Sequence, residues 1–317
     1  MVRTWQQSLV RPLIFGTGAV CLATLFAYGG RWSWACELLV NFRLHFAMLL
    51  IVALVMALAI RGWSIAAVAA LGIALNVWPM YGALFGAGAP PVSNPRAVRV
   101  VEFNVNIANA NLPGIAAYLE SLAPDVVVLA ELSPRKADRL AALLPRLPHR
   151  YFAAREGVWG VAIFSRWPLL APQPAMRGES EIGARVDLDL GDREFRLYGA
   201  HLNWPVLPET ETVRNQQLQA LGRELAECPR ACVAVGDFNV TPWSSHFRDV
   251  LKNPGVHDCA AGRGLHGTWS SDLPAVLRIR IDQCLVAGAV SIAATRVGES
   301  RGSDHFATIN DLLIGGP

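Results

Sequence analysis

Residues 233–239 read Val-Ala-Val-Gly-Asp-Phe-Asn, an apolar run that ends in a carboxylate and an amide. Short apolar runs bounded by turn residues predict buried strands. We therefore expect a strand over 232–238, with Asp237 and Asn239 at its end. Loops that adjoin buried strands often carry the chemistry of a protein, although a single carboxylate there is usually only a turn or helix-cap residue.

The same arrangement recurs at five other points of the chain, so it defines a set of side chains. Expected strands are bordered by Asn104 with Asn106, by Glu131, by His201 with Asn203, by Asp282, and by Asp304 with His305. Carboxylate and amide oxygens without a thiolate suit a hard cation such as Mg²⁺ or Mn²⁺. Histidines beside such a cation suit charge stabilisation and proton transfer on a phosphoryl group.

The order of the expected elements predicts the fold class. Strands are expected over 98–105, 125–132, 161–165, 184–190, 194–202, 232–238, 279–286, 291–297 and 305–312, and helices over 112–122, 134–144, 209–227 and 244–252. Many strands with few intervening helices favour an α+β architecture. We predict a four-layer α/β sandwich of two mostly antiparallel sheets flanked by helices, preceded by three transmembrane helices.

The first 91 residues differ in composition from the rest. Only six of the 53 charged residues precede residue 92, whereas residues 92–317 hold 47 and carry a net charge of −1. Charge-free runs cover 12–30, 44–60 and 62–95. A bilayer span takes about 20 mostly apolar residues. Three spans are therefore expected near 12–30, 42–60 and 63–85.

Two alternatives remain for this region: a cleavable signal peptide, because Arg3 and Arg11 precede the first run, and a buried helical hairpin. Three spans with the N-terminus inside predict a multi-pass protein of the cell membrane whose large domain lies on the outer side. The arginine distribution barely discriminates between the two orientations. Residues 85–95 are rich in Gly and Pro, as linkers are. We place a membrane anchor at 1–91, a linker at 92–98 and a catalytic domain at 99–317.

Cysteine usage leaves the redox state open. Six cysteines in 317 residues are too few for a disulfide scaffold. Cys228, Cys232, Cys259 and Cys284 could form disulfides outside the cytoplasm, or they could be buried thiols. The pair Cys228 and Cys232 has no matching second pair, so it is weak evidence for a metal site.

Seven segments resemble, in order and spacing, the endonuclease/exonuclease/phosphatase superfamily, the DNase I-like group that includes AP endonucleases, inositol-polyphosphate phosphatases and neutral sphingomyelinases. They are VEFNVN (101–106), VVVLAEL (126–132), GVAIFSR (160–166), GAHL (199–202), GDFNVTPW (236–243), RID (280–282) and GSDHF (302–306). The resemblance covers residues 99–313. The three expected spans resemble a membrane-anchored bacterial subgroup.

The resemblance implies three residues on the metal side of the site. Glu131 would be the principal metal ligand, and Asn104 beside it would share the metal or a phosphate oxygen. Asp304 would bind a second ion or its water.

It also implies five catalytic residues. Asp237 would orient or deprotonate the attacking water, and Asn239 would hold the phosphate with its amide. His305 would contact the phosphoryl oxygen, with its orientation and protonation fixed by Asp282. His201 would serve as the acid for the leaving oxygen.

The implied reaction is attack of water on a phosphodiester or phosphomonoester, with Mg²⁺ or Mn²⁺ as the cofactor. The expected partners are a lipid bilayer and a phosphoester substrate. A lipid headgroup or another small phosphodiester ranks before nucleic acid, because the net charge of the soluble part lacks the cationic face expected for duplex binding. Candidate cations in the cleft are Arg135, Arg155, Arg166 and Arg214.

Two alternatives to this function stay open. One is a membrane-tethered nuclease that acts on DNA or RNA, and the other is a non-catalytic relative that binds a phosphorylated ligand. The sequence identifies no protein partner.

Overall fold

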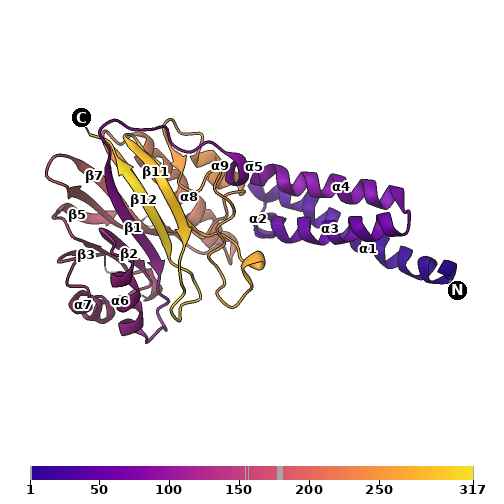
Figure 1. Ribbon diagram of the computed structural model, residues 1–317, viewed down its shortest axis with the longest axis horizontal. Coiled ribbons are helices and arrows are strands. Elements are labelled where there is room, and N and C mark those ends of the chain that lie inside the picture. The colour runs from indigo at the N-terminus through magenta and orange to yellow at the C-terminus, as the bar shows by residue number, and fades with distance from the viewer. Residues whose placement is uncertain (1, 154, 156, 177–180, 317) are drawn as a thin grey trace. The chain divides into compact units, whose positions relative to one another are not determined.

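The computed structural model describes residues 2–153, 155, 157–176 and 181–316, and the chain divides into two compact units (Figure 1). Unit 1 comprises Met1–Gly82 with Thr241–Ser245, and unit 2 comprises Ala83–Val240 with His246–Pro317.

The helices of the first 85 residues are α1 (Val2–Ala27), α2 (Trp34–Val40), α3 (Arg43–Ala59), α4 (Trp63–Val77) and α5 (Tyr81–Phe85). Among the described residues, Val10–Arg31 and Trp63–Phe85 are long and apolar enough to cross a membrane. The second expected span is α3, whose 17 residues are short for a bilayer. It gains length only when counted with α2, from which it is bent by 62°. Two or three spans are therefore available.

Unit 2 contains two six-stranded sheets within the described residues. The first has the order β11-β12-β1-β2-β4-β3, with β1 (Arg96–Asn104), β2 (Val126–Ala130), β3 (His149–Ala153), β4 (Val161–Ser165), β11 (Val290–Val297) and β12 (Thr308–Ile314). The second has the order β5-β6-β7-β8-β10-β9, with β5 (Leu169–Ala175), β6 (Gly183–Asp189), β7 (Glu194–His201), β8 (Ala231–Asp237), β9 (His257–Asp258) and β10 (Asp282–Ala287). In each sheet one pair is parallel, β1 with β2 and β7 with β8, and the other described pairs are antiparallel.

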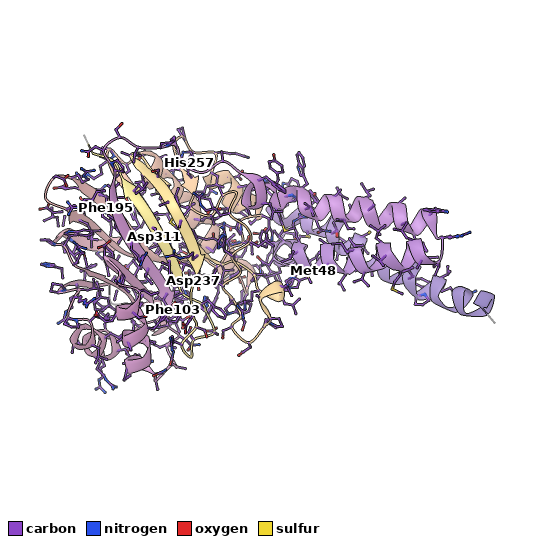
Figure 2. All side chains as sticks on the ribbon, in the orientation of Figure 1. Met48, Phe103, Phe195, Asp237, His257 and Asp311 are labelled. Carbon is purple, nitrogen blue, oxygen red and sulfur yellow. A yellow bond between two sulfur atoms is a disulfide. The ribbon has the colours of Figure 1, made fainter. Side chains whose placement is uncertain are left out.

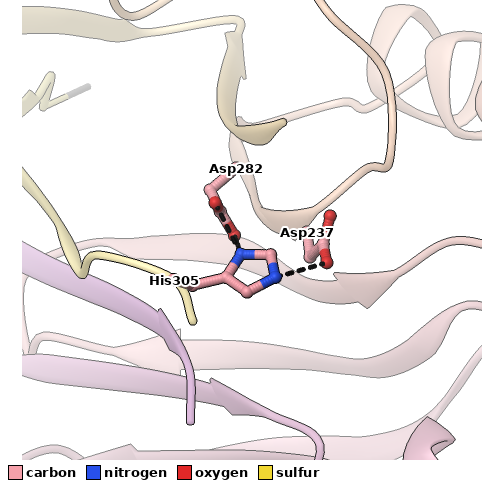
Figure 3. A group of neighbouring side chains, drawn as sticks. All are labelled: Asp237, Asp282 and His305. Atoms are coloured by element: carbon pink, nitrogen blue, oxygen red, sulfur yellow. Dashed lines mark hydrogen bonds and ion pairs between the residues drawn. The ribbon is translucent and has the colours of Figure 1, made fainter. Parts of the chain in front are cut away.

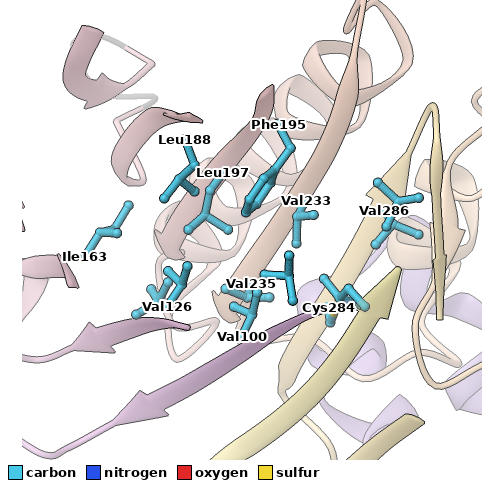
Figure 4. Packing of buried hydrophobic residues seen from close by; sticks show 14 of the residues in the cluster. Val100, Val126, Ile163, Leu188, Phe195, Leu197, Val233, Val235, Cys284 and Val286 are labelled. Atoms are coloured by element: carbon cyan, nitrogen blue, oxygen red, sulfur yellow. The ribbon is translucent and has the colours of Figure 1, made fainter. Parts of the chain in front are cut away.

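The main core lies between the two sheets, where valine side chains from both interdigitate (Figure 4). Val100 and Val126 come from the first sheet, and Val233 and Val235 from the second; all four are fully buried. Residues that alternate with these point to the other face of their sheet, as Phe103 does from β1. Burial of each such side chain contributes about 1.5–3 kcal/mol.

Helices cover both outer faces. On the first sheet α6 (Leu112–Ser121) and α7 (Pro134–Leu143) pack through leucines and Ile115 (Figure 1). On the second sheet α8 (Pro208–Ala226) and α9 (Ser245–Val250) pack through leucines, Phe247 and Val250. The predicted four-layer sandwich of two mostly antiparallel sheets is therefore confirmed.

The sequence prediction missed three strands, β3, β5 and β9. All three are edge strands, which pair on one side only. In β5 two prolines interrupt the pattern, and they are tolerated because an edge strand leaves one row of backbone groups unpaired. β10 and β12 each begin three residues later than expected, so that His305 precedes its strand.

Two disulfides settle the question that the sequence left open. Cys228 is bonded to Cys232, and Cys259 is bonded to Cys284 within the core between the sheets. Cys21 and Cys36 are free thiols in unit 1.

Candidate active site

Strand register gathers polar side chains at one edge of each sheet. Asp237, the last residue of β8, pairs with His201 at the end of β7 and with Asp282 at the start of β10. In the first sheet Asn104 ends β1 beside Ala130, and Glu131 follows directly. The buried Asp237 lies inside unit 2, where Figure 2 labels it.

Asn104 joins the two sheets at this edge. Its Nδ2 donates to Glu131 Oε1 at 3.0 Å and to Asp237 Oδ2 at 3.1 Å, and its Oδ1 accepts from the Asn106 backbone N–H at 3.1 Å. Glu131 Oε2 also accepts from the Ile107 backbone N–H at 3.0 Å. Because Asn104 is fully buried, its amide is a fixed bridge between two carboxylates.

Two histidines face the carboxylate of Asp237. Asp237 Oδ2 lies 3.7 Å from His201 Nε2 and 3.7 Å from His305 Nε2. On its other side His305 Nδ1 lies 2.9 Å from Asp282 Oδ2, so the imidazole stands between two carboxylates (Figure 3). His201, His305, Asp237 and Asp282 are all buried.

The surroundings keep His305 protonated. Burial alone would lower its pKa, but the carboxylates of Asp282, Asp237 and Asp304 raise it to about 10. Burial raises the pKa of Asp237 to about 7, although His305 and the donors Asn239 and Asn104 act in the opposite direction and Asp282 acts in the same one. Near neutral pH this carboxylate can therefore exchange a proton beside an imidazolium.

His201 is in the opposite state. Burial lowers its pKa to about 3, the charge of His305 acts in the same direction, and a backbone contact with Val158 opposes both. His201 is therefore neutral near pH 7. The indole ring of Trp159 packs against it, with ring centroids 4.9 Å apart.

Asp304 and Asn239 occupy the rim of this cluster. Asp304 accepts from Asn106 Nδ2 at 2.7 Å and from Trp269 Nε1 at 3.1 Å. Burial alone would raise the pKa of Asp304, but the amide of Asn106 and the charge of His305 lower it. Asn239 Nδ2 donates to the Leu202 carbonyl at 2.9 Å, and the Asn239 backbone N–H donates to Asp237 at 2.9 Å.

Three polar residues of the cluster have left-handed backbone: Asn106 (φ 61°), Glu131 (φ 59°) and Asn239 (φ 50°). Asparagine tolerates this conformation, but glutamate adopts it rarely. Such backbone costs about 1–3 kcal/mol per residue and concentrates at functional sites. Glu131 is thus held by its surroundings in a conformation that its own chemistry disfavours.

The donor chemistry fits a hard cation. Among the described residues, Asp237, Asp282 and His305 each offer a ligand atom within 4.8 Å of the others, so this buried group could hold a metal ion once His305 has lost its proton, because only the neutral imidazole binds a metal. It differs from the predicted ligands Asn104, Glu131 and Asp304, although Asn104 links Glu131 to Asp237 directly. The roles of all eight predicted residues stay predictions.

Some residues of the cluster escaped the sequence analysis. Glu102, two residues before Asn104, is fully buried and accepts from Thr308 at 3.0 Å; burial and the neighbouring Asp282 carboxylate raise its pKa well above its usual range. Trp159 and Trp269 were also missed. The only signal for Glu102 in the sequence was a charged residue inside an apolar strand. That pattern is also typical of a residue that faces solvent.

The four candidate arginines lie in different places. Arg166 bonds to Asp125 at 2.6 Å, at the end of β2 opposite Glu131, so its expected place in the cleft is wrong. Arg214 donates to the Asn239 carbonyl at 2.8 Å, and Arg155 lies over Trp159. Arg135 is exposed on α7.

A two-sheet sandwich whose buried aspartates and histidines gather at one edge fits a metal-dependent phosphoester hydrolase. The sequence model of the Endonuclease/Exonuclease/phosphatase family matches residues 101–305. The chain belongs to this family, so it is an enzyme of that class. None of the curated proteins matches the chain significantly.

Solved structures share the fold at low sequence identity. An endonuclease/exonuclease/phosphatase from Beutenbergia cavernae is 21% identical, with a TM-score of 0.56 over 70% of this chain and 72% of its own. TDP2 from D. rerio, complexed with a single-strand DNA product, is 19% identical, with a TM-score of 0.56 over 68% and 98%. The 3′ phosphatase NExo from Neisseria, bound to a product DNA hairpin, is 19% identical, with a TM-score of 0.54 over 67% and 98%.

Proposed function

We propose that this protein is a membrane-anchored, Mg²⁺-dependent phosphoesterase that hydrolyses a small phosphodiester or phosphomonoester by attack of water. The observation that carries the proposal is the arrangement of Asp237 between His201 and His305, with Asn104 joining it to Glu131. We assign residues 1–91 to the anchor, 92–98 to the linker and 99–317 to the catalytic domain.

The attacking water is activated at Asp237. A carboxylate with a pKa raised to about 7 accepts a proton efficiently near neutral pH. His305, held protonated by Asp282, donates to a phosphoryl oxygen, where negative charge grows in the transition state. His201 is neutral near pH 7, so its part is that of an N–H donor to the leaving oxygen.

The phosphate is held on the other side by amides and carboxylates. Asn239 donates one amide hydrogen to Leu202 and presents the second to a phosphate oxygen. Glu131, Asn104 and Asp304 would hold Mg²⁺ or Mn²⁺, which when bound would neutralise charge on the phosphoryl group. Oxygen donors with no thiolate favour these hard cations.

The outer side of the membrane is the proposed location of the catalytic domain. Three spans with the N-terminus inside lead there, whereas two spans would return the chain to the cytoplasmic side. The disulfides Cys228–Cys232 and Cys259–Cys284 favour the outer side, because disulfides persist in oxidising compartments.

A nuclease is the second candidate function. The observation that favours it is the DNA product named with both TDP2 from D. rerio and NExo from Neisseria. The two candidates differ in their substrate and not in the chemistry of the site.

The test is hydrolysis by the full chain in detergent, with Mg²⁺, Mn²⁺ or EDTA. Substrates are bis-p-nitrophenyl phosphate, phospholipid vesicles, DNA and RNA. Glu131→Gln or His305→Gln should lower kcat/KM by about 10²–10⁴, which corresponds to roughly 3–6 kcal/mol in the barrier. The matched control is Glu194→Gln, at the opposite end of β7 from His201. Equal rates for Glu131→Gln and wild type, or turnover that EDTA does not change, would contradict the proposal.

A further inference from the structure

Most exposed large apolar side chains of the described residues from 96 to 316 lie in two loops beside the site. Among the described residues of 96–316, eight large apolar side chains are exposed, and six of them lie in these loops. The first rim loop is residues 203–207 and carries Trp204, Val206 and Leu207; the second rim loop is residues 269–276 and carries Trp269, Leu273 and Val276. Exposed apolar side chains that gather in this way are typical of interaction sites, whereas singly scattered ones are not.

The first rim loop reaches the reacting centre through an aromatic contact. The ring of Trp204, 40% exposed, packs against Trp159 with centroids 5.4 Å apart, and Trp159 packs against His201 at 4.9 Å. Val206 and Leu207, 56% and 54% exposed, follow after Pro205. An apolar surface thus runs from solvent to the histidine that we assign to the leaving oxygen.

The second rim loop is bonded to the other side of the same centre. Trp269 Nε1 donates to Asp304 Oδ2 at 3.1 Å, and the Ser271 backbone N–H donates to the Asp304 carbonyl at 2.7 Å. Trp269 also forms a β-bridge with His305. Leu273 and Val276 are further exposed apolar residues of this loop.

The charges of the two loops suit a substrate with few phosphates. The first rim loop has no charged residue, and the second has only Asp272. Arg155, which stacks on Trp159, lies 3.6 Å from Glu181 and is thereby paired. Arg278 donates to the Leu273 carbonyl of the second rim loop at 2.8 Å and stacks on Phe306. A nucleic acid presents a phosphate at every nucleotide and is bound largely through lysine and arginine. These loops offer an apolar contact instead.

We propose that the two rim loops form a binding surface for the hydrocarbon part of an amphiphilic phosphoester, and that the natural substrate is therefore a lipid phosphoester. The inference rests on the proposed function, because it names the substrate class of the same site. The hydrocarbon would lie against the rim loops while the phosphate meets Asp237 and His305. Tryptophan suits this boundary, because its ring is apolar and its N–H is polar.

The test varies the hydrocarbon on the leaving oxygen while the rest of the ester stays constant. Methyl, butyl and octyl esters of phosphocholine are given to the full-length protein with Mg²⁺, below the micellar concentration of each ester, and release of phosphocholine is measured. A methylene fully removed from water favours binding by about fourfold. The wild type should show kcat/KM at least 30-fold higher for the octyl ester than for the methyl ester.

The main variant replaces apolar residues that lie outside the catalytic cluster. Val206→Ser, Leu207→Ser, Leu273→Ser and Val276→Ser together should lower kcat/KM for the octyl ester at least tenfold, with the methyl ester within twofold of wild type. The matched control is Leu143→Ser with Leu170→Ser, whose side chains are 40% and 38% exposed on α7 and β5. This control should behave as wild type with both esters.

Three outcomes would overturn the inference, and they differ from one another. Equal rates for methyl and octyl esters, with hydrolysis that requires metal and Glu131, refute the lipid surface and keep the phosphoesterase. Preference for thymidine p-nitrophenyl phosphate over the octyl ester assigns the site to nucleic acid. No metal-dependent hydrolysis of any ester refutes the proposed function, and the lipid surface falls with it.

Discussion

Replacement of Asn104 by alanine should destabilise the metal-free protein while it leaves the fold intact. The buried amide of Asn104 donates to two carboxylates, Glu131 at 3.0 Å and Asp237 at 3.1 Å, one in each half of the sandwich. A hydrogen bond to a charged group contributes about 1.5–3 kcal/mol. Because both bonds come from one amide and are not independent, we expect a loss of about 3 kcal/mol.

The magnitude translates into a measurable melting shift. For a domain of this size about 1 kcal/mol moves Tm by roughly 2–4 °C, so Asn104→Ala should lower Tm by about 6–12 °C in EDTA. Asn104→Asp should lower it further, because a third carboxylate then joins Glu131 and Asp237. Added Mg²⁺ should raise the Tm of Asn104→Asp more than that of Asn104→Ala, since a ligand that binds only the folded state stabilises it.

The assay is thermal unfolding of the full chain in detergent, with EDTA or with a series of Mg²⁺ concentrations. Asn253→Ala, in a half-buried position on the turn after α9, is the matched control and should move Tm by less than about 4 °C. A Tm for Asn104→Ala within 2 °C of wild type in EDTA would refute the bridging role. Equal Mg²⁺ responses of Asn104→Asp and wild type would refute a cation beside this residue.

Three further predictions concern the site and its support. The pKa of His305 is raised to about 10 in the folded protein against an ordinary 6.5, so its stabilising contribution is complete below pH 6.5 and is lost as the pH rises through about 10. Without metal, Asp282→Asn should lower the pKa of His305, measured by NMR, and should make Tm fall less steeply over this pH range. An unchanged titration of His305 would contradict its pairing with Asp282. Cys259→Ser with Cys284→Ser should lower the free energy of unfolding by about 3.5 kcal/mol, the loop-closure entropy for a separation of 25 residues. Tm should then be lower by roughly 7–14 °C, and an unchanged Tm would argue against the disulfide. Gly236→Ala would bring the new Cβ to 1.8 Å from a carbonyl oxygen of β7, so the backbone next to Asp237 must move. We expect kcat/KM to fall about 10²-fold. Wild-type kinetics would show that β8 can shift without moving the site.

The interior strands could be predicted because burial on both faces leaves continuous apolar runs. Val126–Ala130 and Ala231–Asp237 are of this kind, and the polar residues that end them are the candidate site. Edge strands such as β3 and β5 lack the signal, because one side and part of one face meet solvent. These edge strands form because they pair with a neighbouring strand of the sheet, and their own residues do not predict them.

The sequence analysis predicted polar residues at the strand ends, but it missed Glu102, Trp159 and Trp269 and could not predict the contacts. The sequence indicates which strand ends carry Asp237, Asp282 and His305, but the distance between the two sheets decides that these three meet. Trp159 contacts His201 between the same two sheets, and no periodic pattern in the sequence predicts this contact. Contacts of this kind are properties of the packing.

The pairing of β1 with β12 also bears on how the protein is made. Arg99 of β1 bonds to Asp311 of β12 across 212 positions of chain, and β12 stands between β1 and β11 in the first sheet. Closing so long a loop is slow, and the central part of the sheet cannot be completed until β12 has been synthesised. Asn104 and His305 lie at the two ends of that loop, so the hydrolytic centre assembles only after nearly the whole unit exists. Catalysis can therefore begin only after β12 has been synthesised and has paired with β1.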